Sequence, residues 1–129
     1  QSAGYLLQQR TTAKFRDPNA WYHVVLRVDT TDGTAGNRAR MYVNGVVQTS
    51  FSTETVIGQN TNFLIGDGGA DFRWGTEGSN NRFFLSSYLA DITVIDGTSY
   101  APTAFAETKN DIWIPKDITG LTYAADLGP

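Results

Sequence analysis

The chain has 129 residues, of which 40% are hydrophobic and 18% are charged, and this length and composition suit one folded domain with one hydrophobic core. Its formal net charge of −3 argues against nucleic-acid binding, which depends on clustered lysines and arginines. The sequence has no cysteine, which excludes disulfides and thiolate metal sites, and no apolar stretch long enough to cross a membrane.

The first half of the chain has the pattern of antiparallel strands separated by loops. Apolar residues alternate weakly at 4–9 and clearly at 21–29, which predicts two strands. The face of the second strand that we expect to be buried comprises Tyr22, Val24, Leu26 and Val28. Residues 30–37 are rich in threonine, aspartate and glycine and predict a loop. Two further strands are predicted at 38–43 and 46–49.

Two turn signals mark the ends of these strands. Asp17-Pro18 predicts a turn before the long strand, because proline restricts its own φ and displaces the preceding residue from the helical region. Asn44-Gly45 lies between two runs rich in β-branched residues, and a type I′ turn requires positive φ at both of its central residues. The sequence therefore predicts a tight hairpin at this dipeptide.

The second half of the chain predicts fewer elements. Strands are expected at 63–66, 83–95 and 121–124, and the one good helical candidate, at 102–107, begins with proline. Both faces of the strand at 83–95 carry apolar residues, so we expect it to be central in its sheet. On this interpretation, truncating Ile92 to alanine costs about 2–5 kcal/mol of stability.

Several segments share their residues and their order with a known family. The first three are Asp17-Pro-Asn-Ala-Trp-Tyr-His-Val-Val25, Val28-Asp-Thr-Thr31 and Arg40-Met-Tyr-Val-Asn-Gly45. They are followed by Phe63-Leu-Ile-Gly66, Tyr88-Leu-Ala-Asp-Ile-Thr-Val-Ile-Asp-Gly97, Ala101-Pro-Thr-Ala-Phe-Ala-Glu107 and Ile112-Trp-Ile-Pro-Lys116. Together they resemble a laminin-G-like domain of the concanavalin A-like lectin/glucanase superfamily, in the variant found in structural proteins of tailed phages, particularly marine ones.

The expected fold class is all-β. Many short strands with glycine-rich turns indicate a two-sheet antiparallel β-sandwich, and the resemblance implies a concanavalin A-like jelly roll over residues 1–129 as a single domain. Domains of this variant usually open with a strand carrying a Trp-x-x-Ser/Thr-x-Trp pattern, which residues 1–10 lack. We therefore expect the chain to be a piece of a longer polypeptide, with its first strand or strands supplied from elsewhere.

The carboxylates do not form the pattern that hydrolysis requires. Retaining glucanases use two carboxylates about 5–5.5 Å apart, and on a strand a spacing of two or four residues places both on one face. The glucanases of this fold carry a Glu-x-Asp-x-x-Glu strand. Here Glu54, Glu77 and Glu107 have no acidic partner at these spacings within a strand-like run. The sequence therefore predicts no enzyme, and the lone His23 is expected to be a surface or interface residue rather than a general base.

Two loops carry the oxygen ligands that calcium prefers, and the resemblance implies calcium at one rim of the sandwich. One loop offers Asp29, Asp32 and Asn37, and the other is the long loop at 67–81. The long loop is the favoured place, and its candidate calcium ligands are Asp67, Asp71 and Glu77. Neither loop has a fixed calcium motif, and turns need the same residue types without any metal.

The long loop also has the ingredients of a glycan site. Sugars stack their apolar faces on aromatic rings and bond their hydroxyls to amides and carboxylates. The candidate glycan-binding residues are Phe72, Arg73, Trp74, Asn80 and Asn81. The alternative is that the two aromatic rings cap the core or contact a neighbouring subunit.

The sequence and the resemblance together lead to one functional expectation. We expect a non-catalytic virion structural module, in a tail fibre, an adhesin or a head decoration, located on the virion outside cells. Its partners would be glycans or a host cell surface and other virion subunits, with a homo-oligomer expected and a trimer suited to a fibre. A structural spacer without a ligand is the alternative, and a glycoside hydrolase is disfavoured.

Overall fold

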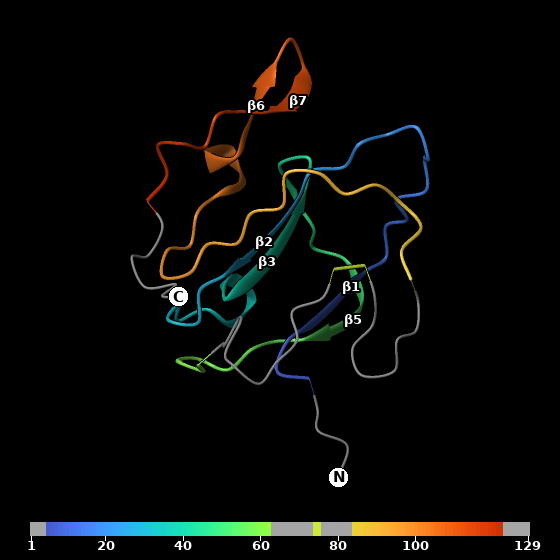
Figure 1. The fold of residues 1–129 in the computed structure, drawn as a ribbon. Coiled ribbons are helices and arrows are strands. Elements are labelled where there is room, and N and C mark those ends of the chain that lie inside the picture. Colours follow the sequence, from blue (N-terminus) through green and yellow to red (C-terminus); the bar gives the residue numbers. More distant parts are fainter. Residues whose placement is uncertain (1–4, 63–73, 76–83, 123–129) are drawn as a thin grey trace.

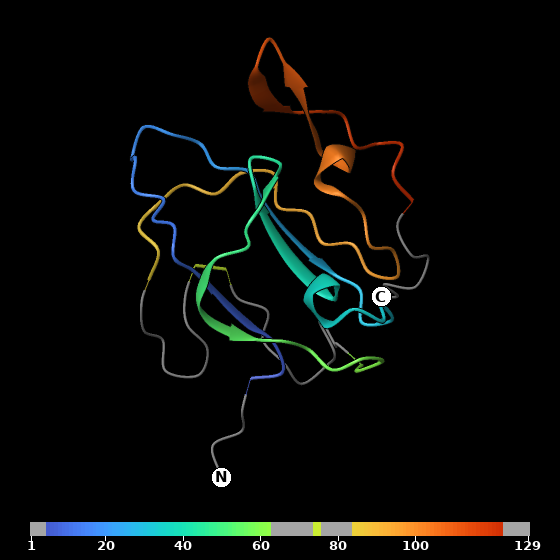
Figure 2. The ribbon, with the colours of Figure 1, turned by 180° about the vertical axis from the view of Figure 1, so that it is seen from behind.

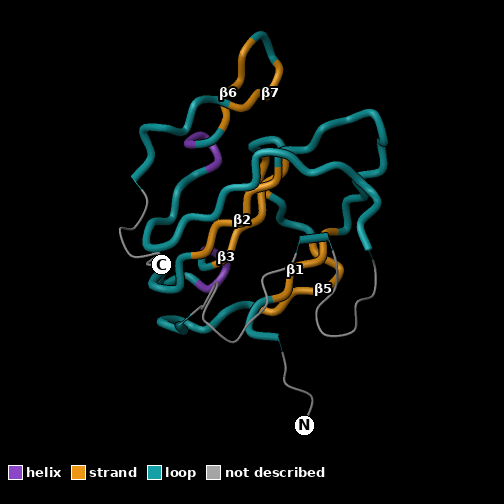
Figure 3. Tube along the Cα trace, viewed as in Figure 1, coloured by secondary structure: helices purple, strands orange, loops and turns teal. Residues whose placement is uncertain are grey.

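The computed structural model describes residues 5–62, 74–75 and 84–122, and these residues form an all-β chain of short antiparallel strands (Figure 1). The strands are β1 (Gln8–Thr11), β2 (Val24–Val28), β3 (Ala39–Val43), β4 (Val46–Val47), β5 (Phe51–Thr55), β6 (Ala106–Lys109) and β7 (Ile112–Pro115). Two single turns of 3-10 helix, η1 (Ala35–Asn37) and η2 (Pro102–Ala104), are the only helical segments among the described residues. Figure 3 shows that loops and turns make up much of the chain between the strands.

The sheet β2–β3–β4 confirms the predicted hairpin. Asn44 and Gly45 both have positive φ, 49° and 77°, as a type I′ turn requires. The Asn44 side-chain oxygen accepts a hydrogen bond from the His23 N–H at 2.8 Å, and the Asn44 N–H donates to the His23 carbonyl at 2.8 Å. The strands are shorter than predicted, because β2 begins only where its ladder with β3 begins, at Val24 opposite Val43.

The ribbon β1–β5 was predicted only in part. β1 begins at Gln8 rather than at residue 4, and β5 was not predicted at all, because it carries a single large apolar residue, Phe51. β5 forms by pairing with β1, with Gln8 opposite Thr55. The ribbon is tied to β3 by the Gln9 side chain, whose Nε2 donates to the Ala39 carbonyl at 3.1 Å.

The C-terminal hairpin β6–β7 was also missed, although its turn resembles the first one. Asn110 and Asp111 both have positive φ, 50° and 61°, and an asparagine followed by an aspartate suits such a turn. Figure 1 and Figure 2 show the hairpin projecting from one end of the molecule. Trp113 anchors it: its Nε1 donates to His23 Nδ1 at 3.1 Å, and its ring lies so close to Gly45 that a Cβ there would come within 2.8 Å.

The predicted central strand at 83–95 is wrong over the described residues 84–95, which contain no strand. Tyr88 is 90% exposed and Ile92 is 51% exposed, so neither side chain is in a core. Asp91 has φ 52°, in the left-handed region, which interrupts an extended backbone. The alternation of apolar residues indicated a face that could be buried, but a strand also needs a hydrogen-bonding partner along its edge.

The predicted buried face of β2 is wrong at two of its four positions. Val24 and Leu26 are more than half exposed, while Val43 and Ala39 on the neighbouring strand are buried. On this face of the sheet, the buried side chains therefore belong to β3 rather than to β2. Residues 121–122 are not in a strand, and the strand predicted at 63–66 lies outside the described residues.

The core of the described part of the chain is small. The buried hydrophobic residues are Ala39, Val43, Ile57 and Ala106. The proline predicted to begin a helix does begin one turn, η2, and Phe105 at its end packs edge-to-face against Tyr100 with ring centroids 6.3 Å apart. No helix in the described ranges is long and apolar enough to span a bilayer.

Candidate functional site

Most of the residues proposed from the sequence as a site lie outside the described part of the chain. They are Phe72, Arg73, Asn80, Asn81, Asp67, Asp71 and Glu77. Trp74 is described, and its side chain is 52% exposed. The next residue, Gly75, accepts a hydrogen bond from the Leu85 N–H at 2.6 Å, which ties this point of the loop to the segment that follows it. The long-loop site therefore stays a prediction.

The other loop proposed for calcium uses its oxygens to close turns. The Asp29 carboxylate accepts hydrogen bonds from the Thr31 hydroxyl at 2.7 Å and the Thr31 N–H at 3.1 Å, and these bonds lower the pKa of Asp29. Asp32 accepts from the Thr34 N–H at 2.7 Å. Across the residues that the structure describes, no three acidic or histidine side chains gather as a metal site would require. Both carboxylates of this loop therefore accept hydrogen bonds that close its turns, and calcium there stays a prediction.

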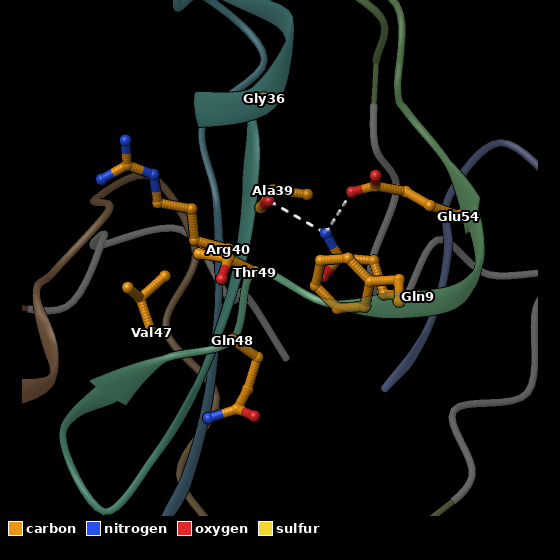
Figure 4. A pocket seen from close by; sticks show the side chains of 9 residues that line it. Gln9, Gly36, Ala39, Arg40, Val47, Gln48, Thr49 and Glu54 are labelled. Carbon is orange, nitrogen blue, oxygen red and sulfur yellow. Dashed lines mark hydrogen bonds between the residues drawn. The ribbon is translucent and has the colours of Figure 1, made fainter. Parts of the chain in front are cut away.

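A pocket of about 320 Å³ lies between the β1–β5 ribbon and the sheet edge formed by β3 and β4 (Figure 4). It opens where the chain leaves β4 and crosses to β5, so residues of both elements line it. Its polar side chains are Gln9, Arg40, Gln48, Thr49 and Glu54, and Phe51 and Val47 add apolar surface. A carboxylate, two amides, a guanidinium, a hydroxyl and an aromatic ring therefore surround one small space.

Gln9 and Glu54 form one wall of the pocket. The Gln9 Nε2 donates to the Ala39 carbonyl and, at 3.3 Å, to the Glu54 carboxylate, as Figure 4 shows. Both partners are acceptors, so the amide orientation is determined: Nε2 must face them. The Gln9 Oε1 is buried and accepts no hydrogen bond. A buried polar atom without a partner typically costs about 1–3 kcal/mol, so a donor that reaches this oxygen would be stabilising.

Arg40 also lines the pocket, and Figure 4 shows its guanidinium pointing away from Gln9 and Glu54. Its side chain is half-buried and donates to the Asn37 side-chain oxygen. Within the described residues, the one ion pair joins Arg27 to Asp29, at 3.8 Å, so Arg40 has no carboxylate partner there. The polar wall of the pocket is therefore formed by Gln9 and Glu54, and the Arg40 guanidinium is held by Asn37.

Sequence reasoning missed this pocket because its residues come from four separate strands, from η1 and from the crossing segment after β4. Gln9 and Glu54 are 45 positions apart and meet only when β1 pairs with β5. One signal was available: Phe51-Ser-Thr-Glu-Thr55 has β-propensity from its aromatic and threonine residues. This propensity alone, without an alternation of apolar residues, does not predict the strand or its partner.

Comparison with known families gives one match. Residues 1–96 match a family model described as the concanavalin A-like lectin/glucanases superfamily. The chain belongs to this family. All residues that line the pocket fall within the matched part, whereas the β6–β7 hairpin falls beyond it. No curated protein and no solved structure matches the chain.

Family membership bears on the fold and, more coarsely, on function. The antiparallel all-β chain is consistent with the β-sandwich of the concanavalin A-like superfamily, which confirms the predicted fold class. The superfamily suggests carbohydrate binding or a structural role. Because one fold hosts many functions, the chemistry of the pocket has to carry the choice between them.

Proposed function

We propose that this domain is a non-catalytic carbohydrate-binding module of a virion structural protein, and that the pocket between β1–β5 and β3–β4 holds the sugar. The observation that carries the proposal is the set of side chains around the pocket. Sugar recognition uses amides and carboxylates for the hydroxyls and a ring for the apolar face, and this pocket has Gln9, Gln48, Glu54 and Phe51.

The size of the pocket supports a small ligand. Ligand pockets range over roughly 300–1,000 Å³, and this one, at about 320 Å³, is at the lower end. It suits one sugar unit, such as the terminal residue of a glycan chain, rather than a long oligosaccharide. Its position at a sheet edge leaves the rest of the glycan in solvent.

The carboxylates around the pocket favour binding over hydrolysis. Glycosidases of both stereochemical types need two carboxyl groups, one on each side of the scissile bond. Glu54 is the one carboxylate among the residues that line this pocket, and the Gln9 amide donates a hydrogen bond to it. A single carboxylate in this role orients hydroxyl groups and supplies no nucleophile and acid/base pair.

The virion setting comes from the phage-like order of the sequence motifs. On this proposal the domain acts outside cells, in a tail fibre, an adhesin or a head decoration, and its glycans belong to a host cell surface. The other partners would be virion subunits, with a homo-oligomer, such as a trimer, as the working form. Calcium would bind in the long loop at 67–81, where Asp67, Asp71 and Glu77 supply its oxygens.

A purely structural role is the second candidate, and the exposed apolar side chains of the segment after the long loop favour it. Tyr88 is 90% exposed, and Phe84 and Leu85 are also more than half exposed. Apolar side chains this exposed are typical of surfaces that another subunit covers. In this case the domain would be a spacer, and its contacts would be with virion subunits rather than sugars.

Replacing Glu54 tests the two candidates. We expect the purified chain to bind members of a bacterial surface-glycan panel, and Glu54→Gln to weaken binding about tenfold or more, because hydrogen bonds to a charged group contribute about 1.5–3 kcal/mol. Isothermal titration calorimetry measures both affinities. Glu107→Gln makes the same change on β6, at an exposed position outside the pocket, and should leave the affinity unchanged.

Two further comparisons separate the sites. If Trp74→Ala or EDTA abolishes binding while Glu54→Gln does not, the sugar binds in the long loop and the pocket proposal is wrong. If the folded chain binds no glycan with calcium or with EDTA, the domain is a structural spacer.

A further inference from the structure

The turn between β3 and β4 contains a pair of residues that is prone to a spontaneous chemical change. Asparagine is among the residue types least resistant to chemical damage, and a following glycine exposes it further, because no Cβ shields the main-chain nitrogen that attacks its side chain. Asn44-Gly45 is the only asparagine-glycine pair among the 129 residues. Asn44 is exposed, so water reaches it.

This change, deamidation, needs no enzyme, and water is its only co-reactant. The Gly45 nitrogen forms a bond to Asn44 Cγ, the Cγ–Nδ2 bond breaks, and Nδ2 leaves as ammonia with the proton that the Gly45 nitrogen loses. Water then opens the resulting succinimide ring at either carbonyl and gives aspartate or isoaspartate. In isoaspartate the main chain runs through Cγ and is one carbon longer.

The conformation of the turn opposes closure of this ring. A reaction within one molecule is fast only when the reacting atoms approach each other in the right geometry. Asn44 and Gly45 have φ of 49° and 77°, as in a type I′ turn, whose first central residue has ψ of about +30°. At this ψ the Gly45 nitrogen points away from the Asn44 side chain. The peptide between the two residues therefore has to swing round before the ring can close.

His23 and Trp113 hold the turn in this conformation. The His23 N–H donates to Asn44 Oδ1 and the His23 carbonyl accepts from the Asn44 N–H, both at 2.8 Å, so the side chain and the main chain of Asn44 are both fixed. The Trp113 ring lies so close to Gly45 that an added Cβ would come within 2.8 Å of it. The hydrogen bond from Trp113 Nε1 to His23 Nδ1, at 3.1 Å, keeps the ring in this place.

We infer that Asn44 is a deamidation site and that Trp113, on the β6–β7 hairpin, protects it in the folded chain. Deamidation then requires a local opening in which the Trp113 ring leaves the turn. This site and its protection do not depend on the proposed sugar-binding function.

The modification would reach beyond the turn itself. β4 follows Gly45 directly, and Val46 pairs with Val43 across the hairpin. An additional main-chain carbon in a two-residue loop changes this register, because the loop length determines how the strands pair. Val47 and Gln48 come next along the chain and line the pocket, so isoaspartate at this turn would also disturb the pocket wall.

Peptide mapping by mass spectrometry measures the reaction in the full chain. The protein is incubated at mildly alkaline pH, folded in buffer and unfolded in urea, and the peptide that contains Asn44 is separated into its asparagine, aspartate and isoaspartate forms. We expect the folded chain to lose Asn44 at least about tenfold more slowly than the unfolded chain, which corresponds to about 1.4 kcal/mol of opening free energy.

Variants of the hairpin show whether Trp113 is the protecting residue. Trp113→Ala removes the ring and should accelerate the loss of Asn44 in buffer by about tenfold. Trp113→Phe keeps a ring without the N–H donor and should accelerate it less, which covers the case that Trp113→Ala folds poorly. Ile112→Ala truncates the neighbouring side chain, which is 63% exposed, and should keep the wild-type rate. Thermal unfolding reports whether each variant is folded.

Four results would overturn the inference. Equal loss of Asn44 in the folded and unfolded chains would show that the turn gives no protection. Wild-type rates in the folded Trp113 variants would show that the hairpin has no part in it. An Ile112→Ala rate as high as that of the Trp113 variants would indicate general loosening of the hairpin. An unfolded chain that keeps Asn44 intact would remove the site altogether.

Discussion

At the scale of single residues, Trp113 connects the C-terminal hairpin to His23 and to the turn at Gly45. Trp113 Nε1 donates to His23 Nδ1 at 3.1 Å, and the Trp113 ring covers the turn at Gly45. An imidazole nitrogen can accept a hydrogen bond only while it carries no proton. The contact therefore depends on the neutral form of His23, which is the only histidine in the chain.

This dependence predicts that acid destabilises the protein in the range where histidine titrates. Burial lowers the pKa of His23 below its ordinary value of 6.5, so the folded chain binds this proton less tightly than the unfolded chain does. Stability is therefore full above pH 6.5 and decreases as the pH falls through the lowered pKa. Urea unfolding at a series of pH values, followed by tryptophan fluorescence, measures the change.

His23→Gln is the control, because glutamine can accept the Trp113 hydrogen bond without titrating. It should remove the pH dependence in this range. Asp29 and Asp117 have lowered pKa values because they accept hydrogen bonds from Thr31 and Thr119, so they stay charged here and lose their contribution only in stronger acid. An unchanged pH dependence in His23→Gln would contradict the role given to His23.

At the scale of elements, local signals were enough for some strands and insufficient for others. The β3–β4 hairpin could be predicted because Asn44-Gly45 determines its own turn. β5 could not be predicted, because its few apolar residues do not alternate clearly. It becomes a strand by pairing with β1. For the segment 84–95 the sequence predicted a strand that the structure does not contain. Its apolar residues alternate strongly, but Asp91 has a left-handed backbone conformation and the segment forms no strand ladder.

Two isoleucines allow a core position to be compared with a position in this exposed segment. Ile57 is 1% exposed and Ile92 is 51% exposed. Truncating Ile57 to alanine should lower the free energy of unfolding by about 2–5 kcal/mol, through lost burial and a cavity. The same change at Ile92 should stay within about 0.5 kcal/mol, as is usual for surface positions. Urea denaturation of both variants makes the comparison, and a large loss in Ile92→Ala would show that this residue is buried in solution.

At the scale of the whole molecule, the fold class was more predictable than the site. Strand periodicity and the order of the motifs led to an antiparallel all-β chain, which family membership supports over residues 1–96. The pocket depends on how four strands, η1 and the segment between β4 and β5 are placed, and Gln9, Arg40 and Glu54 form no pattern in the sequence. The sequence prediction chose the long loop instead, because aromatic and amide residues are close together there. A sequence motif contains only residues that are neighbours along the chain, so it does not detect a site built from distant segments.

The central claim is that the sugar binds between the β1–β5 ribbon and the β3–β4 edge. The most direct test is to titrate isotope-labelled protein with a sugar that binds it on the bacterial glycan panel and map the shifted amide signals. We predict that the largest shifts cluster at Gln9, Arg40, Phe51 and Glu54, with little change at Trp74 or in the β6–β7 hairpin. Shifts centred on Trp74, or no shifts at saturating sugar, would contradict this location for the binding site.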